Sequence, residues 1–313
     1  MTFTQLEYVL AVDKHRHFAR AAKACFVTQP TLSMQLQKLE EELRIRIFDR
    51  SKQPVLPTEQ GLAVIEHAKL IMAERDLLLE VTQEKKNEIS GTLRVGIIPT
   101  LAPYLLPLFI NRFLKKHPLV KLHVTEMMTE ELVQSVKDGS VDAGILVTPL
   151  QDNNVQEEPL FYEEMKVYTT PKNSTYIKNY LLPQDIDPNQ LWLLEEGNCF
   201  RSQIVNLCEL RRKSAAGSNF QYEAGSFESL KRMVDLNDGL TILPELALTD
   251  LSSRQKNQIR SFKPPVPVRE VSLIVRRVYL KRKLLEVLRK EILNSLPEKI
   301  RKNKSTMVVP IKE

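Results

Sequence analysis

The stretch that decides the fold spans residues 18–50 and has the sequence FARAAKACFVTQPTLSMQLQKLEEELRIRIFDR. Its first seven residues, 18–24, predict a short helix. Thr28 stands two residues before Pro30, and a capping hydroxyl followed by a proline in the first turn predicts that another helix begins there. Leucines recur along this helix at helical spacing, so one face is expected to be buried: Leu32, Leu36, Leu39 and Leu43. The opposite face is polar and uncharged near the helix start and becomes acidic at residues 40–42.

The flanking residues complete a module over residues 1–58. A first helix is expected to bury Phe3, Leu6 and Leu10, which are spaced three and four residues apart. An extended hairpin is predicted over residues 46–58, because alternating isoleucines lead into a polar, proline-containing turn. The module therefore consists of helices followed by a hairpin.

A long helix follows the cap at Thr58. Its length of about 45 Å exceeds what one small domain can cover. Ile65, Met72 and Leu79 recur every seven residues, which indicates a seam for a partner helix, and residues 59–90 are predicted to be a linker and dimerisation helix. The alternative is that this apolar face lies on its own domain.

Between residues 91 and 300 strands alternate with helices, which indicates parallel β-α-β units. The first run has strands at 93–98, 120–125 and 143–147, with helices at 101–116 and 130–138. The second run has strands at 165–169, 191–194 and 240–243, with helices after residue 198 and at 227–236. A late strand at 271–275 could return to the first run. Two similar α/β lobes with a cleft between them are therefore expected, followed by a helix at 281–296 and a basic tail, residues 301–313, that is expected to be disordered.

The composition of the 313-residue chain is that of a soluble globular protein, with 42% hydrophobic and 27% charged residues. No apolar run approaches the roughly 20 residues of a membrane span and no signal peptide is evident, so a cytoplasmic protein with no membrane partner is expected. The net charge of +6 is concentrated at the ends: residues 1–57 carry nine basic and six acidic side chains, and residues 276–313 carry twelve and four. Two basic ends around an acidic body are typical of a nucleic-acid binder.

Four segments of the first module, residues 18–22, 27–33, 38–40 and 48–50, resemble the DNA-binding signature of the LysR family of transcription regulators. The resemblance extends over the whole chain, because the double α/β lobe is the effector domain of that family. It implies an N-terminal all-α winged helix-turn-helix, a long linker helix and a C-terminal two-lobed α/β sensor domain like that of periplasmic binding proteins. It also implies the partners: double-stranded promoter DNA, further copies of the chain in a dimer or homotetramer, and RNA polymerase.

Two further segments resemble the peroxide-sensing members of this family. They are residues 98–107, IPTLAPYLLP, and residues 194–201, LEEGNCFR, followed by Cys208. This likeness implies an activator that senses hydrogen peroxide through a reversible disulfide between Cys199 and Cys208. One departure is Asn198, which stands where the familiar sensors have histidine, and this difference bears on proton handling and on reaction rate.

The outward face of the third helix supplies the expected DNA contacts. Glutamine, serine and arginine can pair with base edges in the major groove, which an α-helix fits. The candidates are Gln29, Pro30, Thr31, Ser33 and Met34 on the helix and Arg50 on the wing. Pro30 and Met34 could contact thymine methyl groups, and Arg50 suits phosphate or the narrow minor groove. The alternative is that these residues only solvate a surface helix.

The cysteine segment carries a chemical argument of its own. Cys199 lies at an expected helix start, where the helix dipole and Arg201 would stabilise a thiolate. A thiolate attacks peroxide to give a sulfenic acid, which a second thiol, here Cys208, can condense into a disulfide. Nine residues of helix would separate the two Cα atoms by about 13 Å, whereas a disulfide tolerates about 4.4–6.8 Å. Forming the bond would therefore unravel the helix.

Thr100 and Thr129 are expected to complete a peroxide pocket with Asn198 and Arg201, because both threonines lie where a strand ends and a helix begins. Either threonine could instead be a plain helix cap. The two cysteines could likewise be structural thiols, as Cys25 is expected to be.

Two other functions remain open at this level. The cleft between the lobes could bind a small organic effector, with the cysteines incidental. A thiol peroxidase or disulfide oxidoreductase would be an enzyme, but the chain lacks a Cys-x-x-Cys motif and its first 90 residues would then be unexplained, so no enzyme is expected. No cofactor or metal is expected either, because His15 and His17 have no further ligands nearby.

Overall fold

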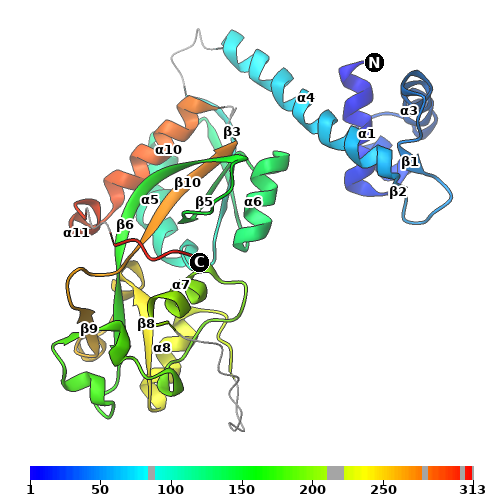
Figure 1. Cartoon of the computed structure of the whole chain (residues 1–313). Helices are drawn as coiled ribbons and strands as arrows, with labels where there is room; N and C mark the ends of the chain where they lie inside the picture. The colour runs from blue at the N-terminus through cyan, green and yellow to red at the C-terminus, as the bar shows by residue number, and fades with distance from the viewer. Residues whose placement is uncertain (84–88, 210–221, 277–280, 304–306, 312–313) are drawn as a thin grey trace. The chain divides into compact units, whose positions relative to one another are not determined.

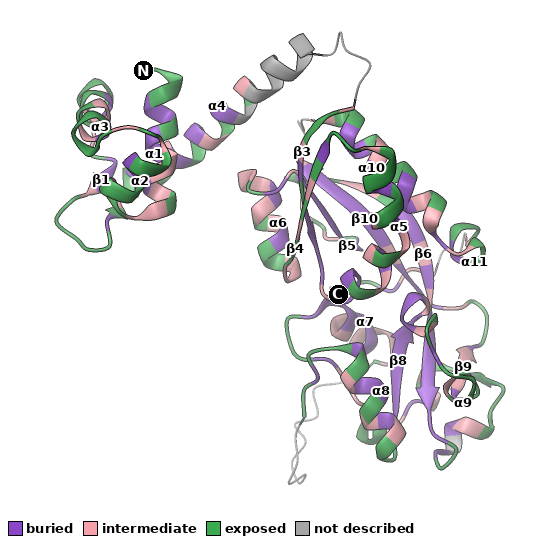
Figure 2. Cartoon of the chain, turned by 180° about the vertical axis from the view of Figure 1, so that it is seen from behind, coloured by how far each residue is buried: buried purple, intermediate pink, exposed green. Residues whose placement is uncertain are grey.

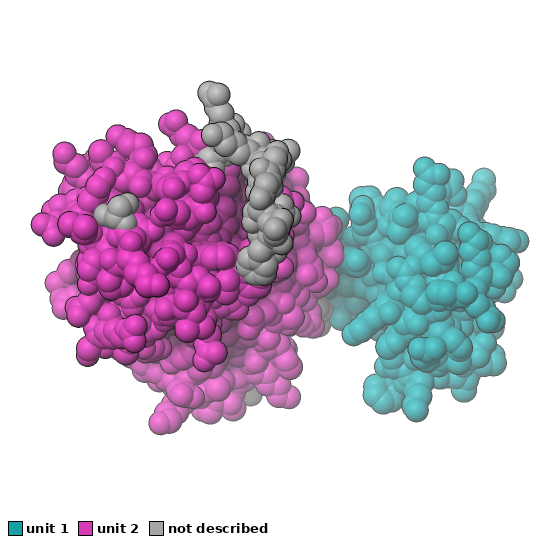
Figure 3. Space-filling view, turned by 90° about the horizontal axis from the view of Figure 1, so that it is seen from below, with its two compact units in different colours: residues 1–88 teal, residues 89–313 magenta. Residues whose placement is uncertain are grey.

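The computed structural model describes residues 1–83, 89–209, 222–276, 281–303 and 307–311. The chain divides into two compact units, Met1–Glu88 and Ile89–Glu313, coloured teal and magenta in Figure 3. None of the helices in the described ranges is long and apolar enough to cross a membrane.

The first unit combines helices with a short hairpin (Figure 1). Helices α1, α2, α3 and α4 span Phe3–His15, Phe18–Ala24, Gln29–Leu43 and Glu59–Gln83, and strands β1 (Phe48–Asp49) and β2 (Leu56–Pro57) pair antiparallel. Thr28 caps α3 by accepting the N–H of Thr31, and the imidazole Nδ1 of His17 caps α2 by accepting the N–H of Ala19. The predicted helices and the hairpin are confirmed.

Helices α1 and α3 contribute Leu6, Val9, Val12, Leu32, Leu36 and Leu39 to the core of this unit. Two residues predicted to be buried are not. Phe3 is 51% exposed, with the guanidinium of Arg75 over its ring, and Leu43 is 37% exposed. They are the first residue of α1 and the last residue of α3, so each lies at the edge of the core. Leu10 is half-buried against it.

The heptad spacing on α4 was expected to mark a seam for a partner helix, and this interpretation is wrong for two of its three residues. Ile65 and Met72 are 3% and 9% exposed and belong to the core of their own unit. The side chain of Leu79 lies outside the described residues. A seven-residue repeat arises wherever a helix keeps one face on an apolar surface, and here that surface is α1.

One strained position in this unit gives a stability prediction. Arg44 ends α3 in the left-handed conformation, with φ +55°, and its side chain is exposed. A side chain in this conformation costs about 1 kcal/mol relative to glycine. Arg44→Gly is therefore expected to stabilise the first unit by about 0.5–1 kcal/mol, measured from hydrogen exchange of its slowest amides. Arg44→Ala is the control and should give no such gain, and equal effects of the two variants would contradict the assignment.

The second unit begins with a lobe in which strands and helices alternate as predicted. The parallel strands β3 (Gly91–Ile97), β4 (Val120–Glu126) and β5 (Ala143–Thr148) are connected by α5 (Ala102–Lys116) and α6 (Thr129–Asp138). Strand β10 (Val268–Arg276) pairs antiparallel with β5, which confirms the predicted late return to this lobe. Helix α10 (Arg282–Ser295) contacts α5.

The second lobe shares the long strand β6 (Val155–Thr169) with the first. This strand pairs with β10 in the first lobe and with β8 (Leu240–Pro244) and β9 (Ile259–Phe262) in the second. All three pairings are antiparallel, so the expectation of parallel units is wrong for the predicted strands at 165–169 and 240–243, whereas the bridges Leu191–Leu240 and Leu194–Ala224 are parallel. The strand predicted at 191–194 consists of isolated bridges from Leu191 and Leu194. Helices α7 (Cys199–Leu207) and α8 (Phe227–Leu236) complete this lobe, and Figure 2 shows the strands of both lobes largely buried.

The C-terminal segment is ordered where it was expected to be disordered. Helix α11 spans Glu298–Arg301, and the backbone of Val268 donates to Met307 and accepts from Val309 at 3.0 Å each. Val309 is buried in the core of the second lobe. The predicted disordered tail is therefore wrong for residues 307–311, because they add apolar contacts and backbone hydrogen bonds to β10.

Candidate functional site

The start of α7 places the thiol of Cys199. The side-chain oxygen of Asn198 accepts the N–H of Phe200 at 3.1 Å and so caps the helix. Gly197 precedes the cap with φ +85°, a conformation that favours glycine. Cys199 is consequently the first residue of the helix and is buried. The positive end of the helix dipole favours a thiolate over a thiol at this position.

A small cavity adjoins this thiol. The Sγ of Cys199 donates to the Oγ1 of Thr129 at 2.8 Å. The cavity has a volume of about 10 Å³, which suits one water-sized molecule, and it is lined by Ile98, Pro99, Thr100, Met128, Thr129, Gly197, Asn198 and Cys199. Thr129 is the first residue of α6 and its cap is Met128, and the cap of α5 is Leu101. Neither predicted threonine is a plain N-cap, and three of the four predicted pocket residues line this cavity with the thiol.

The fourth predicted pocket residue, Arg201, lies elsewhere. Its guanidinium donates to the carbonyl oxygen of Leu194 at 2.6 Å and forms ion pairs with Glu223 at 3.5 Å and Glu196 at 3.9 Å. It does not line the cavity. Arg201 was predicted to line the pocket because it lies two residues after Cys199 in the sequence, but the helix directs its side chain away from the cavity.

A different arginine stands behind the cavity. Arg269, from β10, donates to the Oγ1 of Thr100 at 3.5 Å and to the carbonyl oxygen of Thr100 at 3.3 Å. It is fully buried and pairs with Glu163 of β6, which is also fully buried, at 2.5 Å. Sequence reasoning missed both residues, because each lies in a strand far from the cysteines in the sequence and has another charged residue beside it, Glu164 in β6 and Glu270 in β10. The sequence of either strand does not distinguish the buried charge from its neighbour.

Aromatic rings connect α7 to the rest of the second unit. The guanidinium of Arg269 lies 5.2 Å from the ring centre of Phe200, and Phe200 packs edge-on against Phe227 of α8 at 5.1 Å. Phe227 in turn packs against Tyr104 of α5 at 6.1 Å. The residue after the thiol therefore lies in a continuous packed row between the two lobes.

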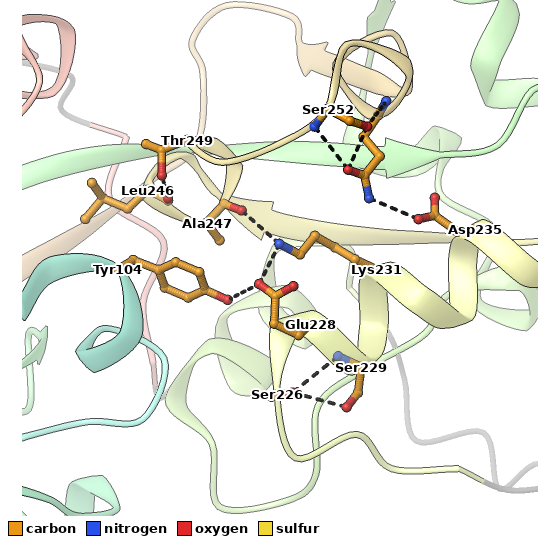
Figure 4. A network of polar contacts seen from close by, with 11 residues as sticks. Tyr104, Ser226, Glu228, Ser229, Lys231, Asp235, Leu246, Ala247, Thr249 and Ser252 are labelled. Carbon is orange, nitrogen blue, oxygen red and sulfur yellow. Dashed lines mark hydrogen bonds and ion pairs between the residues drawn. The ribbon is translucent and has the colours of Figure 1, made fainter. Parts of the chain in front are cut away.

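Figure 4 shows the polar contacts at the end of this row. The hydroxyl of Tyr104 donates to Glu228 at 3.1 Å, and Lys231 lies between the carboxylate of Glu228 at 2.6 Å and the carbonyl of Ala247 at 3.4 Å. Burial, followed by the charge of Glu228, raises the pKa of Tyr104 above its ordinary value. These contacts join α5 of the first lobe to α8 of the second.

Cys208 occupies the other end of α7. The helix predicted to separate the two cysteines is present, and Cys208 is its C-cap, with its N–H bonded to the carbonyl of Ile204. It is half-buried, and burial raises the pKa of its thiol to about 12. Cys25, in the first unit, also has a raised pKa, because of burial and then the charge of Glu7. All three cysteines are thiols in this structure.

A second, larger cavity adjoins the first, and Cys199 lines both of them. Its volume is about 330 Å³, and its lining includes Thr129, Lys137, Asp152, Ser202 and Ile311. Lys137 and Asp152 form an ion pair of 2.5 Å at its wall. Ile311 belongs to the C-terminal segment, which α7 also holds: Gln203 donates to the carbonyl of Val309 at 2.6 Å and Asn206 to that of Pro310 at 3.0 Å.

The predicted DNA-contacting residues lie on α3 and on the turn that follows β1. Gln29, Pro30, Thr31, Met34 and Arg50 are exposed, and Ser33 is half-buried. The guanidinium of Arg50 donates to the Oγ of Ser33 at 3.2 Å. The wing and the outer face of α3 are therefore in direct contact.

Comparison with known proteins covers both units. Residues 3–62 match the family model "Bacterial regulatory helix-turn-helix protein, lysR family", and residues 86–297 match "LysR substrate binding domain". The hydrogen peroxide-inducible genes activator of Dickeya chrysanthemi is 33% identical over 88% of this chain and 90% of that protein. The DNA-binding transcriptional dual regulator OxyR of Escherichia coli (strain K12) is 32% identical over the same shares. A solved full-length OxyR from Pseudomonas aeruginosa with a Cys-to-Asp substitution is 32% identical and matches with a TM-score of 0.77 over 93% of this chain and 97% of that one.

Proposed function

The chain belongs to the LysR family of transcription regulators and resembles the peroxide sensor OxyR, and on this basis we propose that it senses hydrogen peroxide through Cys199 and Cys208. The observation that carries the proposal is the position of the Cys199 thiol, which lies at a helix start and within 2.8 Å of Thr129 beside a cavity for one small polar molecule.

The chemistry takes two steps. The sulfur of Cys199 attacks one oxygen of hydrogen peroxide, the O–O bond breaks, and the products are a sulfenic acid and water. The sulfur of Cys208 then attacks the sulfenic sulfur, the S–O bond breaks, and a disulfide and a second water form. Thr100 and Thr129 offer hydroxyls to the peroxide, and the positive charge of Arg269 behind Thr100 favours the anionic sulfur.

The second step requires α7 to unravel. The helix places the two Cα atoms about 13 Å apart, twice what a disulfide spans. The thiol of Cys208 is also held protonated by burial, with a pKa of about 12, so it attacks efficiently only after it is exposed. Oxidation and conformational change are then one event.

Unravelling of α7 should release the C-terminal segment, because Gln203 and Asn206 hold Val309 and Pro310. Loss of two hydrogen bonds of about 0.5–1.5 kcal/mol each predicts about tenfold faster hydrogen exchange over residues 307–311 in the oxidised protein. Mass spectrometry of a C-terminal peptide measures it. The control is Cys208→Ser treated with the same peroxide, which should exchange at the reduced rate. Unchanged exchange in a protein with a mapped disulfide would contradict the coupling.

We also propose that Gln29, Pro30, Thr31, Ser33, Met34 and Arg50 contact promoter DNA. The exposure of all of them except the half-buried Ser33, which contacts Arg50, supports this proposal. Two-fold operators require paired readers, so the proposal includes self-association and, for activation, contact with RNA polymerase. Since Ile65 and Met72 are buried in their own unit, the exposed Leu62 and Leu70 of α4 replace them as candidate contacts with a second copy.

Intact-protein mass spectrometry before and after one equivalent of peroxide tests the sensing proposal. The expected result is loss of two hydrogen atoms per chain, mapped to one bridge between Cys199 and Cys208. A mass unchanged by peroxide, with both thiols still titratable, would overturn it.

The second candidate function is a response to a small organic effector. The cavity of about 330 Å³ favours it, since pockets for such ligands begin at about 300 Å³. This function leaves the thiols incidental, so it predicts a transcriptional response that survives replacement of Cys199.

A further inference from the structure

The carboxylate of Glu40 is tied to the wing by three contacts. Glu40 lies on α3, and its side chain is only 10% exposed. Its Oε1 accepts the N–H of Ile47 at 2.8 Å and the N–H of Phe48 at 3.3 Å, where β1 begins. Its Oε2 accepts from Nη2 of Arg50 at 2.8 Å. One side chain thus satisfies the backbone at the start of the wing and the arginine that directly follows its first strand.

The other side of the guanidinium completes a bridge. The Nη1 of Arg50 donates to Ser33 at 3.2 Å, and the plane lies 5.1 Å from the ring centre of Phe18. Arg50 therefore contacts α2 and α3 although it belongs to the wing. An arginine side chain has many rotamers in water, and these contacts restrict it to a position beside Ser33.

The neighbouring acids do not take part. Glu41 accepts from Gln37 on its own helix, and Glu42 binds the amino group of Met1. Within the described part of the first unit, Glu40 is the acid of α3 that contacts the wing. The hydrogen-bonding geometry, and not the acidic run as such, distinguishes it.

We infer that Glu40 is a positioning residue for DNA recognition, which fixes Arg50 of the wing relative to Ser33 of the recognition helix before DNA is bound. The inference rests on the proposed DNA-contacting role of Arg50 and Ser33. A prearranged arginine loses less conformational entropy on the correct site, so the contact adds to sequence-specific affinity. Glu40 also repels phosphate, so its charge weakens binding to any DNA.

These two effects have opposite signs and can be separated. The test uses the full-length protein held reduced with dithiothreitol, one duplex selected by the wild type from a randomised pool, and a shuffled duplex of the same composition. Glu40→Gln should lower the ratio of affinities for the selected and shuffled duplexes about tenfold. Glu41→Gln is the matched control: it removes the same charge one residue away and should raise affinity for both duplexes while leaving their ratio unchanged. Equal ratios in the two variants would overturn the inference.

A double-mutant cycle tests whether Glu40 affects DNA recognition through Arg50. If Glu40 acts through Arg50, Glu40→Gln should have no further effect on the ratio in an Arg50→Ala background, and additive losses would overturn the inference. Arg50→Lys keeps the charge and leaves the bonds of Glu40 to Ile47 and Phe48 intact, but it cannot bridge Ser33 and Glu40 as a planar fork does. Arg50→Lys should lower the ratio of affinities for the selected and shuffled duplexes as Glu40→Gln does. A folded Arg50→Lys variant with the wild-type ratio would contradict the bridge, even if Glu40→Gln failed to fold. If Arg50→Ala and Gln29→Ala both leave the ratio unchanged, the proposed DNA contacts themselves are wrong.

Discussion

Replacement of Cys199 by serine is expected to abolish the transcriptional response to low peroxide. A serine hydroxyl is not oxidised to a sulfenic acid, and Cys208 cannot substitute, because burial holds its thiol protonated with a pKa of about 12. The response is measured with a reporter promoter and with the number of titratable thiols before and after peroxide. The loss should be complete at concentrations at which the wild type is fully oxidised.

Two further cysteine variants separate the roles. Cys208→Ser should still consume one equivalent of peroxide and accumulate a trappable sulfenic acid on Cys199. Cys25→Ser is the matched control, since it removes a half-buried thiol from the other unit and should respond normally. If Cys199→Ser keeps a full response, peroxide sensing by this thiol is wrong and the organic effector of the large cavity takes its place.

The first unit was predictable because its signals are local. Helix α3 begins directly after Thr28, whose hydroxyl caps it, and Pro30 lies in its first turn. Both signals act on neighbouring residues, so they can be recognised without knowledge of the folded structure. The burial of Ile65 and Met72 was not predictable, since heptad spacing describes one face of a helix and not what covers it. The wing contact of Glu40 also depends on the folded unit, because residues 41–46 must first bring the backbone of Ile47 back to α3.

In the second unit, residues at the start of α7 were predicted from the sequence, whereas the residue of β10 that contacts Thr100 was missed. Asn198, singled out as a departure from histidine, has a structural task as the cap of α7. Histidine can perform the same task, as His17 does for α2, so capping alone does not explain the difference. Arg269 reaches Thr100 across 169 positions of sequence, and no spacing pattern encodes such a contact. Arg201 was chosen because it is near Cys199 in sequence, and the helix directs it to Glu223 instead.

The buried pair of Arg269 and Glu163 leads to the second large prediction. Arg269→Met is expected to destabilise the second unit by about 3–5 kcal/mol, because it leaves the carboxylate of Glu163 buried without its partner. Urea unfolding followed by the fluorescence of Trp192, the single tryptophan of the chain, measures the change within this unit.

A double variant then distinguishes stability from reactivity. Glu163→Gln removes the buried charge and keeps an oxygen that can accept the N–H of Leu246, so Glu163→Gln combined with Arg269→Met should recover most of the lost stability. The same double variant lacks the cation behind Thr100, and its Cys199 should still react with peroxide about tenfold more slowly than the wild type at neutral pH. Raising the pH should narrow that gap, because any thiol ionises in alkali. A double variant that regains both stability and the wild-type rate would show that Arg269 only holds the two strands together.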